Sequence, residues 1–201
     1  MSDFYAGEKI NRRLIVDWVP EGARVLDVGC GSGELLAELA AEKNTRGWGV
    51  DNSVGALREC IVKGIPALYH DVDTGLGQFH DRQFDMVITV VSLQQFHRPL
   101  RVLTEMLRIG KECILVFPNF GHWCNRLYLM RQGRMPVSSE LPYQWHDTPN
   151  IHFFTVGDFY DTCAELNIDV LAAELVTAGG APCRFLGGWR SALAYFKLRR
   201  R

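Results

Sequence analysis

The chain has 201 residues, of which 47% are hydrophobic, and its formal net charge at pH 7 is −1. This length suits one domain with a large buried core, so we expect a single domain over residues 1–201. A charge so close to zero gives no overall attraction to nucleic acid. No apolar run reaches the length of a transmembrane helix, and the first residues lack the apolar core of a signal peptide, which favours a cytoplasmic protein away from membranes.

The cysteines and histidines indicate neither disulfides nor a metal. Six cysteines are scattered without a C-x-x-C pair, and several lie in apolar segments, as is typical of reduced thiols. The histidines show no H-x-x-H or H-E-x-x-H spacing, so no metal site is predicted. The arginines at 199–201 are interpreted as a solvated end rather than an anchor.

The first half of the chain has the order of a nucleotide-binding unit. Apolar residues at helical spacing predict a helix over 9–19, and an apolar strand is predicted over 24–28. That strand runs directly into glycines, an apolar-periodic helix follows, and a second strand over 47–51 ends at Asp51. A strand, a glycine turn and a helix in this order predict the first half of a βαβ unit that binds a nucleotide.

The glycine-rich turn and the end of the second strand supply the first candidate site. Gly29 and Gly31 allow a sharp turn and the close approach of a ligand, and Asp51 is placed to accept hydrogen bonds from ribose hydroxyls. The alternative is a turn that only packs helix against sheet, with an aspartate that caps the next helix. The predicted cofactor residues here are Asp27, Gly29, Cys30, Gly31, Gly33, Asp51 and Asn52.

The residue at position 34 bears on which cofactor this turn binds. A dinucleotide site with the G-x-G-x-x-G spacing would have its third glycine there, but the residue is Glu34. Its carboxylate would repel a pyrophosphate at the helix N-terminus, whereas S-adenosylmethionine (SAM) has no phosphate and carries a positive sulfonium. The pattern D-x-G-x-G-x-G from Asp27 to Gly33 resembles motif I of the class I SAM-dependent methyltransferases. A phosphate-bearing cofactor is the less favoured alternative.

The third and fourth strands extend the candidate site. A short strand is predicted over 67–69, and the acidic residues that follow would lie in the cofactor crevice. Asp71 could accept a hydrogen bond from an adenine amino group, as the resemblance also implies, and Val72 could pack on the ring; the alternative is that Asp71 or Asp73 caps a turn. Residues 84–91 are predicted to form the central strand, which would bring Val91 to the cofactor.

The residues after the central strand argue against two kinds of methyl acceptor. Enzymes that methylate planar amides or bases carry an Asp/Asn-Pro-Pro-aromatic motif here, and the sequence from Val91 to Gln94 does not match it. Methylation of nucleobases or glutamine is therefore disfavoured. His97 could be a general base, but its place at a helix start is also typical of a capping or surface histidine, so no catalytic residue is assigned.

The second half of the chain completes an α/β fold. Further helices are predicted over 99–108 and 123–130 and after the capping box at Thr155, and further strands over 111–117, 168–177 and 191–198. No helix is predicted between the last two strands, so they should form an antiparallel hairpin. We therefore expect a doubly wound, mostly parallel seven-stranded sheet whose last strand is antiparallel, the Rossmann-like class I methyltransferase fold.

A long irregular region at about 118–153 interrupts this order. It leaves from the carboxyl end of the fifth strand and is rich in aromatic and arginine residues. Loops of this length in a compact domain are usually functional, so it is interpreted as a partner surface or a substrate lid. The alternative is that its aromatic residues only cover the end of the sheet.

Three stretches of the chain resemble the MetW family, the methionine-biosynthesis W proteins of bacteria. They are RVLDVGCGSGELL, FPNFGHW-x-NRLYL and GRMPVSSELPYQW-HDTPNIHF. The last two are the more specific, because general methyltransferases do not carry them. The resemblance implies SAM-binding motifs, a role in methionine biosynthesis and association with homoserine O-acyltransferase, whose activity the family supports.

Two functions follow from these observations. In the favoured one, the chain is an accessory or regulatory subunit that binds SAM or S-adenosylhomocysteine (SAH) and contacts an acetyl- or succinyl-transferring homoserine O-acyltransferase through residues 119–153. In the other, it is a methyltransferase for an unidentified small molecule. Whether the chain also forms a homo-oligomer stays open.

Overall fold

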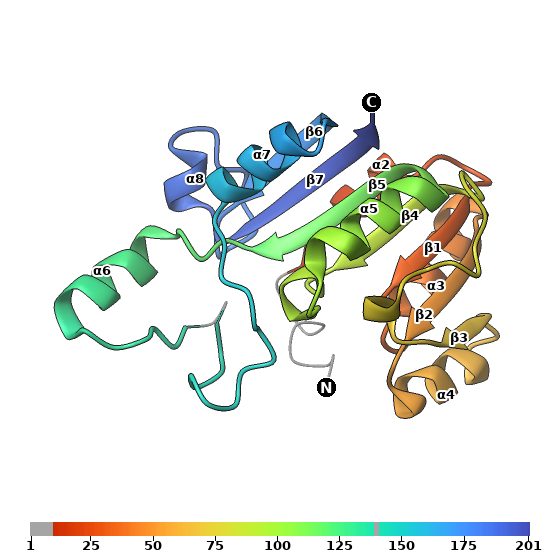
Figure 1. The fold of residues 1–201 in the computed structure, drawn as a ribbon, viewed down its shortest axis with the longest axis horizontal. Helices are drawn as coiled ribbons and strands as arrows, with labels where there is room; N and C mark the ends of the chain where they lie inside the picture. Colours follow the sequence, from red (N-terminus) through yellow and green to blue (C-terminus); the bar gives the residue numbers. More distant parts are fainter. Residues whose placement is uncertain (1–9, 139–140) are drawn as a thin grey trace.

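Seven strands form one sheet in the computed structural model, which describes residues 10–138 and 141–201 (Figure 1). The strand order is β3-β2-β1-β4-β5-β7-β6. The first five strands in this order are parallel, and β7 is antiparallel to both of its neighbours. The strands are β1 (Arg24–Val28), β2 (Arg46–Asp51), β3 (Ala67–Tyr69), β4 (Phe84–Val90), β5 (Gly110–Pro118), β6 (Ile168–Val176) and β7 (Leu193–Arg200). The predicted fold class is confirmed.

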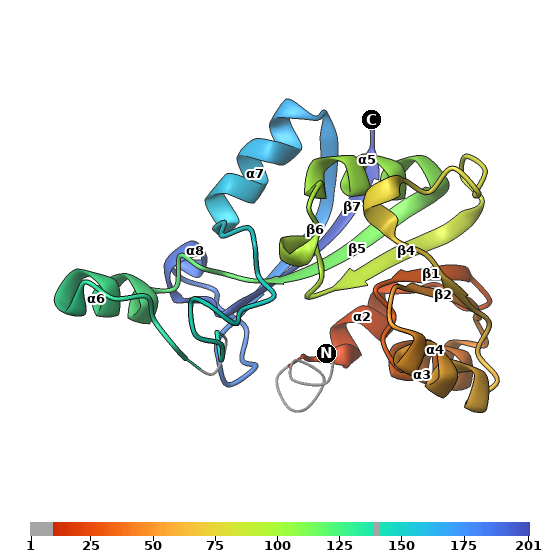
Figure 2. The same cartoon turned by 60° about the horizontal axis from the view of Figure 1, so that its bottom comes forward.

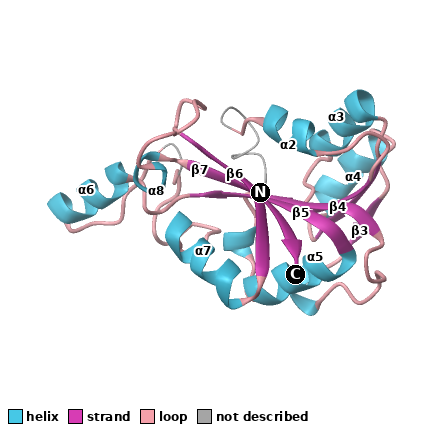
Figure 3. Ribbon diagram, turned by 90° about the horizontal axis from the view of Figure 1, so that it is seen from above, coloured by secondary structure: helices cyan, strands magenta, loops and turns pink. Residues whose placement is uncertain are grey.

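Helices cover both faces of this sheet (Figure 3). On one face lie α2 (Arg12–Trp18), α3 (Glu34–Lys43) and α4 (Val54–Val62), and on the other lie α5 (Pro99–Ile109) and α7 (Val156–Glu165). Each face has its own apolar core, and the central strands β4 and β5 contribute buried residues to both. Strands buried on two faces read as nearly continuous apolar runs, which is why the sequence pattern located them well.

Local signals set several of the helix ends. The Ser53 side chain accepts a hydrogen bond from the amide of Ala56 at the start of α4. Thr155 and Asp158 form the predicted capping box at the start of α7. Asn167 has a left-handed backbone just after that helix, with a φ of +53°. The first helix begins at Arg12, and position 9 of its predicted range lies outside the described residues.

The insert between β5 and α7 extends away from the sheet (Figures 1 and 2). It carries α6 (Trp123–Gln132), two residues longer than predicted and followed by the left-handed Gly133. The ends of the insert meet, because the amide of Phe120 donates to the carbonyl of Phe154 and its ring lies 4.5 Å from that of Phe153. The insert therefore leaves the sheet and returns to it at the same place. Residues 139–140 of the insert lie outside the described part.

The connection between β6 and β7 differs from the prediction. A one-turn helix, α8 (Gly187–Arg190), lies there, so the expectation of a connection without a helix is wrong. The carbonyl of Leu186 accepts hydrogen bonds from the amides of Trp189 and Arg190, which form this turn. The sequence pattern did not predict it because the surrounding glycines are typical of a loop. The antiparallel pairing of β6 with β7 is nevertheless as predicted. In the described part of the chain, no helix is long and apolar enough to cross a membrane.

Candidate functional site

A pocket of about 300 Å³ lies at the carboxyl ends of four adjacent parallel strands, β3, β2, β1 and β4. This is the edge at which open α/β sheets bind ligands. Six of the predicted cofactor residues line it: Gly29, Asp51, Asn52, Asp71, Val72 and Val91. The geometry therefore brings together residues that are far apart in the sequence, while their roles toward a cofactor stay predictions.

Asp51 holds the glycine turn in place. One carboxylate oxygen accepts a hydrogen bond from the amide of Gly31 at 2.9 Å, and the other accepts from the amide of Ser53 at 2.8 Å. Gly31 has a φ of +53°, a conformation that favours glycine. Since a carboxylate has about four acceptor positions, Asp51 can serve the turn and still present lone pairs to a ligand in the pocket.

The wall next to Gly29 is tightly built. A Cβ at Gly29 would lie 2.7 Å from the Ser92 hydroxyl oxygen, so a larger residue does not fit there without displacing Ser92. Val91 has a φ of +54°, which is rare for a β-branched residue. Such a conformation costs of the order of 1–3 kcal/mol and persists where surrounding contacts enforce it, often at functional sites.

The two aspartates after β3 have different local roles. Asp71 caps a short 3-10 helix (Val72–Thr74), and one of its oxygens accepts from the amide of Asp73. The Asp73 carboxylate accepts from the backbone amides of His97 and Arg98, at 2.9 and 2.7 Å. Asp71 thus has the capping role that was the alternative reading, whereas Asp73 holds the backbone just before α5, and both aspartates also line the pocket. The capping role of Asp71 does not exclude a contact with a ligand.

Four predicted residues do not line the pocket. Asp27 is 3% exposed, and its Oδ1 has no hydrogen-bond partner among the described residues. Burial, together with the nearby Asp51 charge, raises the pKa of Asp27 to about 7. Cys30 is buried in the core of the α2–α4 face. Gly31 and Gly33 lie in the turn itself, where the Cys60 thiol donates to the carbonyl of Gly31. These residues shape the turn from behind.

The charge of the pocket indicates the kind of ligand it suits. Among the described residues, its lining contains Asp51, Asp71 and Asp73 but no lysine or arginine. Glu34, at the start of α3, forms an ion pair with Arg12 of α2. An acidic site favours a cationic ligand and disfavours a phosphate. The residues present therefore fit SAM, as the sequence predicted, better than a dinucleotide.

The pocket is connected to the insert through Gln94, which is completely buried. The Gln94 side chain donates a 2.9 Å hydrogen bond to the carbonyl of Val91 in the pocket wall. The backbone carbonyl of Gln94 accepts hydrogen bonds from the amides of Ile151 and His152, both at 3.0 Å. The returning end of the insert is therefore fixed to a residue that holds the pocket wall.

Eight further residues line the pocket and were not among the predicted cofactor residues. They are Val50, Ser53, Asp73, Val90, Ser92, Gln95, Phe96 and His97. The signal was present for Ser92 to His97, since polar residues directly after the central strand must lie at the ligand edge of the sheet. His97 is exposed at the pocket. This position is compatible with a general base and with a capping or surface histidine, so its role stays a prediction. Asp85 lies at the opposite end of β4, where Arg24 and Lys111 pair with it.

Solved structures with the same fold include SAM-dependent methyltransferases. One from Methanosarcina mazei superposes with a TM-score of 0.68 at 19% identity, over 93% of this chain and 96% of that one. The [4+2]-cyclase SpnF superposes equally well, with a TM-score of 0.68 at 17% identity, over 94% of this chain and 80% of that one. Likeness at this level shows the fold alone, and the cyclase illustrates that the fold does not determine the reaction.

Sequence comparison identifies the family. The chain is 35% identical over 168 residues to the bifunctional methionine biosynthesis protein MetXA/MetW of Rhodopirellula baltica. The match covers 79% of this chain but only 27% of that relative, so the chain spans about a quarter of its length. The family model of the methionine biosynthesis protein MetW matches residues 9–198. The chain therefore belongs to the MetW family of methionine biosynthesis proteins.

Proposed function

We propose that this chain is a SAM-binding accessory subunit of methionine biosynthesis that supports a homoserine O-acyltransferase. The observation that carries the proposal is the bifunctional relative, in which a MetXA part and a MetW part form one polypeptide. Fusion keeps two domains at a high effective concentration, which benefits proteins that act together. The family resemblance names the acyltransferase as the enzyme that a MetW protein supports.

The acidic pocket supports the cofactor part of the proposal. In this arrangement Asp51 would accept hydrogen bonds from the ribose, Asp71 from the adenine amino group, and Val72 would contact the ring. The carboxylates of the pocket would favour the sulfonium of SAM over neutral analogues. When bound, SAM supplies an electrophilic methyl group, but an accessory role requires only that the ligand is held.

The Gln94 connection supports a regulatory use of that ligand. A ligand against Val91 would bias the position of the Val91 carbonyl, and Gln94 would pass this to the backbone of Ile151 and His152. A ligand can shift an equilibrium only through a difference in its affinity for the two states. The strained backbone of Val91 could relax in one of the two states, which would give the ligand a different affinity for each. We infer that SAM occupancy sets the conformation of the insert.

A methyltransferase acting on a small molecule is the second candidate. His97 lines the pocket and is the residue that could take a proton from an acceptor. A base is needed only when the acceptor is protonated at the working pH. A methylated product formed from SAM by the purified chain, and lost in His97→Ala, would establish this alternative.

Reconstitution with the acyltransferase tests the accessory role. We expect the purified chain to raise the rate of homoserine O-acyltransferase and saturating SAM to change that effect severalfold. Gln94→Ala removes the hydrogen bond to Val91 but keeps the backbone of residue 94, so it should abolish the response to SAM while complex formation persists. An acyltransferase rate that is the same with and without the chain would contradict the proposal.

Gln95→Ala is the matched control for this experiment. The side-chain nitrogen of Gln95 also donates to the carbonyl of Val91, at 2.8 Å, but no described hydrogen bond joins Gln95 to the insert. This variant removes an equivalent bond without removing the connection. The acyltransferase should therefore still respond to saturating SAM. If both variants lose the response equally, the response to SAM depends on the wall of the pocket and not on the connection through Gln94.

Trp145 offers a test of the insert as the contact with the acyltransferase. Its side chain is 76% exposed, an unusual position for a tryptophan outside an interface. We expect Trp145→Ala to weaken the complex at least tenfold and to leave SAM affinity unchanged. Calorimetric titrations with the acyltransferase and with SAM measure the two quantities separately. An equal loss of both would identify the segment as a cofactor lid.

A further inference from the structure

Helix α6 presents apolar side chains that the rest of the described chain does not cover. Asn125 is its only buried residue, although the helix contains tryptophan, tyrosine, leucine and methionine. Met130 is 76% exposed, and Trp123, Tyr128 and Leu129 are also exposed. Trp123, Leu127 and Met130 recur at the spacing of one helix face. Packing within the described chain therefore contributes little to the stability of this helix, and an external contact would add to it.

A second exposed apolar group lies beside it, on α8 and the two residues before α8, outside the insert. Phe185 is 70% exposed, and Leu186 and Trp189 are also exposed. The rings of Trp123 and Trp189 lie 6.1 Å apart, so the two groups are continuous. Together they form what we term the α6–α8 face: residues 119–138 and 177–192.

A buried asparagine fixes the two parts of this face relative to each other. The amide nitrogen of the Asn119 side chain donates to the carbonyls of Gly188 and Ser191, at 3.0 and 2.9 Å. The Asn119 side-chain oxygen accepts from the amide of Gly121, where the insert begins. Asn119 thus ties the base of the insert to α8. The face is held as one surface and is not formed by two independent loops.

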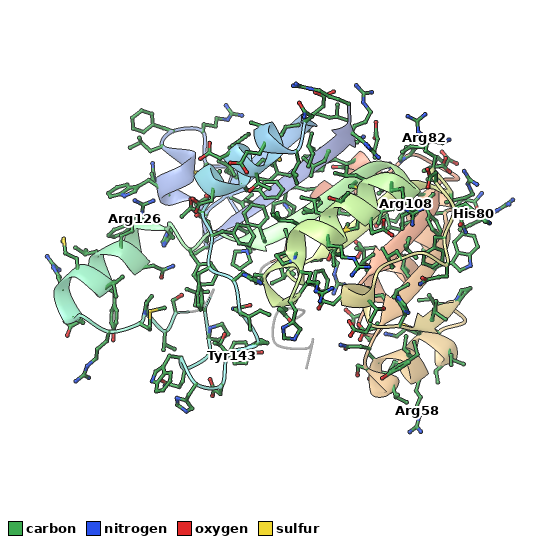
Figure 4. The ribbon with its side chains drawn as sticks, in the orientation of Figure 1. Arg58, His80, Arg82, Arg108, Arg126 and Tyr143 are labelled. Atoms are coloured by element: carbon green, nitrogen blue, oxygen red, sulfur yellow. The ribbon has the colours of Figure 1, made fainter. Side chains whose placement is uncertain are left out.

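The charge of the α6–α8 face is entirely positive. Its two segments contain arginines at 126, 131, 134, 184 and 190 and no aspartate, glutamate or lysine. None of these arginines forms an ion pair within residues 10–138 and 141–201. Arg126 donates instead to the carbonyl of Gly121 at the base of α6 (Figure 4). Aromatic residues, methionine and arginine are the types enriched in protein interfaces.

We propose that the α6–α8 face docks into an apolar groove bordered by carboxylates on the homoserine O-acyltransferase. This inference rests on the proposed function and extends the contact from the insert to α8. Apolar side chains at helical spacing on α6 suit a helix laid into a groove, and the arginines without an ion pair favour acidic partners at its rim.

The same charges argue against a second copy of this chain as the occupant. A twofold dimer through the face would bring its five arginines against the same five arginines without an intervening acid. Like charges across an interface are unfavourable. A single-stranded RNA would also find arginine and aromatic residues here, but the net charge of −1 gives it no long-range attraction. The acidic groove of a protein partner is therefore the occupant that the surface favours.

Variants on α8 test the proposal, because the insert alone would not involve them. We expect Trp189→Ala and Arg190→Glu each to weaken binding of the full chain to the acyltransferase at least tenfold, measured by calorimetry. Arg58→Glu is the matched control: it reverses an exposed charge on α4, at the far side of the molecule from α6 (Figure 4), and should change the affinity less than twofold. SAM affinity should be unchanged in all three variants, which also reports that they fold.

The outcomes separate this inference from the proposed function. If the wild-type chain binds the acyltransferase and both α8 variants bind as tightly as the wild type, the interface does not include α8 and the inference is wrong. If the wild-type chain does not bind at all, the proposed function itself fails. Sedimentation of the free chain and titration with a fluorescent oligouridine provide the remaining tests: dimerisation or RNA binding that Arg190→Glu abolishes would overturn the choice of occupant.

Discussion

Asp51→Ala should lower the affinity for SAM about 100-fold or more. Hydrogen bonds to a charged group contribute about 1.5–3 kcal/mol each, and the variant would lose those that the carboxylate makes to a ribose. It also removes the bonds from Asp51 to the amides of Gly31 and Ser53, which hold the glycine turn against the start of α4. Both effects act in the same direction, and isothermal calorimetry with SAM and SAH measures their sum.

Two comparisons separate the ligand contact from the support of the turn. Asp51→Asn keeps one acceptor oxygen for the backbone but loses the charge, so a loss close to that of Asp51→Ala would indicate that the ligand contact dominates. Asp71→Ala removes a pocket carboxylate whose side chain bonds only within its own turn, and we expect a smaller loss of about tenfold. Thermal melting without ligand controls for folding. Wild-type affinity in Asp51→Ala would show that the ribose assignment is wrong.

Asp27→Asn should remove a pH dependence from the free energy of unfolding. The pKa of Asp27 is raised from 3.8 to about 7 by burial and by the charge of Asp51. The folded state therefore binds a proton that the unfolded state has released at intermediate pH, and stability falls as the pH rises from about 4 to about 7. At 1.36 kcal/mol per pH unit this reaches roughly 4 kcal/mol at most. Asparagine does not ionise, so the variant lacks this pH dependence of the free energy of unfolding.

The measurement is urea unfolding of both proteins at several pH values, read as the difference between them. Wild-type stability relative to Asp27→Asn should decline through that window and level off above it. Asp85 provides a contrast of opposite sign, because hydrogen bonds from Arg24 and Lys111 hold the pKa of its carboxyl below its usual range. The contribution of Asp85 is present above pH 4 and is lost as the pH falls. A wild-type to Asp27→Asn difference independent of pH would mean that Asp27 stays ionised in the fold.

The features that the sequence predicted well are those with a local or periodic signal. The strands β1, β4 and β5 were located from apolar runs, and the glycine turn from its spacing, because one short segment contains the whole pattern. The pairing of Asp51 with the Gly31 amide could be anticipated, since neighbouring strands in a βαβ unit end side by side.

The features that were missed depend on contacts between distant segments. Gln94 looks like an ordinary loop residue, and its role follows only from the arrival of Ile151 and His152 more than fifty positions later. The one-turn α8 lies among glycines that are typical of a loop, and Asn119, just after the neighbouring strand β5, holds it in place. The residue pattern of one segment cannot predict a hydrogen bond whose partner lies in a distant segment.

The uncovered apolar surface of α6 also limits the concentration at which the free chain should stay in solution. Exposed apolar patches promote aggregation of a free chain, so a surplus over its partner would be poorly soluble. Making the two proteins as one polypeptide, as in the R. baltica relative, fixes their ratio at one to one and leaves no surplus. If the chain acts as the proposed subunit, co-production with the acyltransferase should therefore keep more of it in solution than production of the chain alone, and the soluble yield of the two expressions measures the difference.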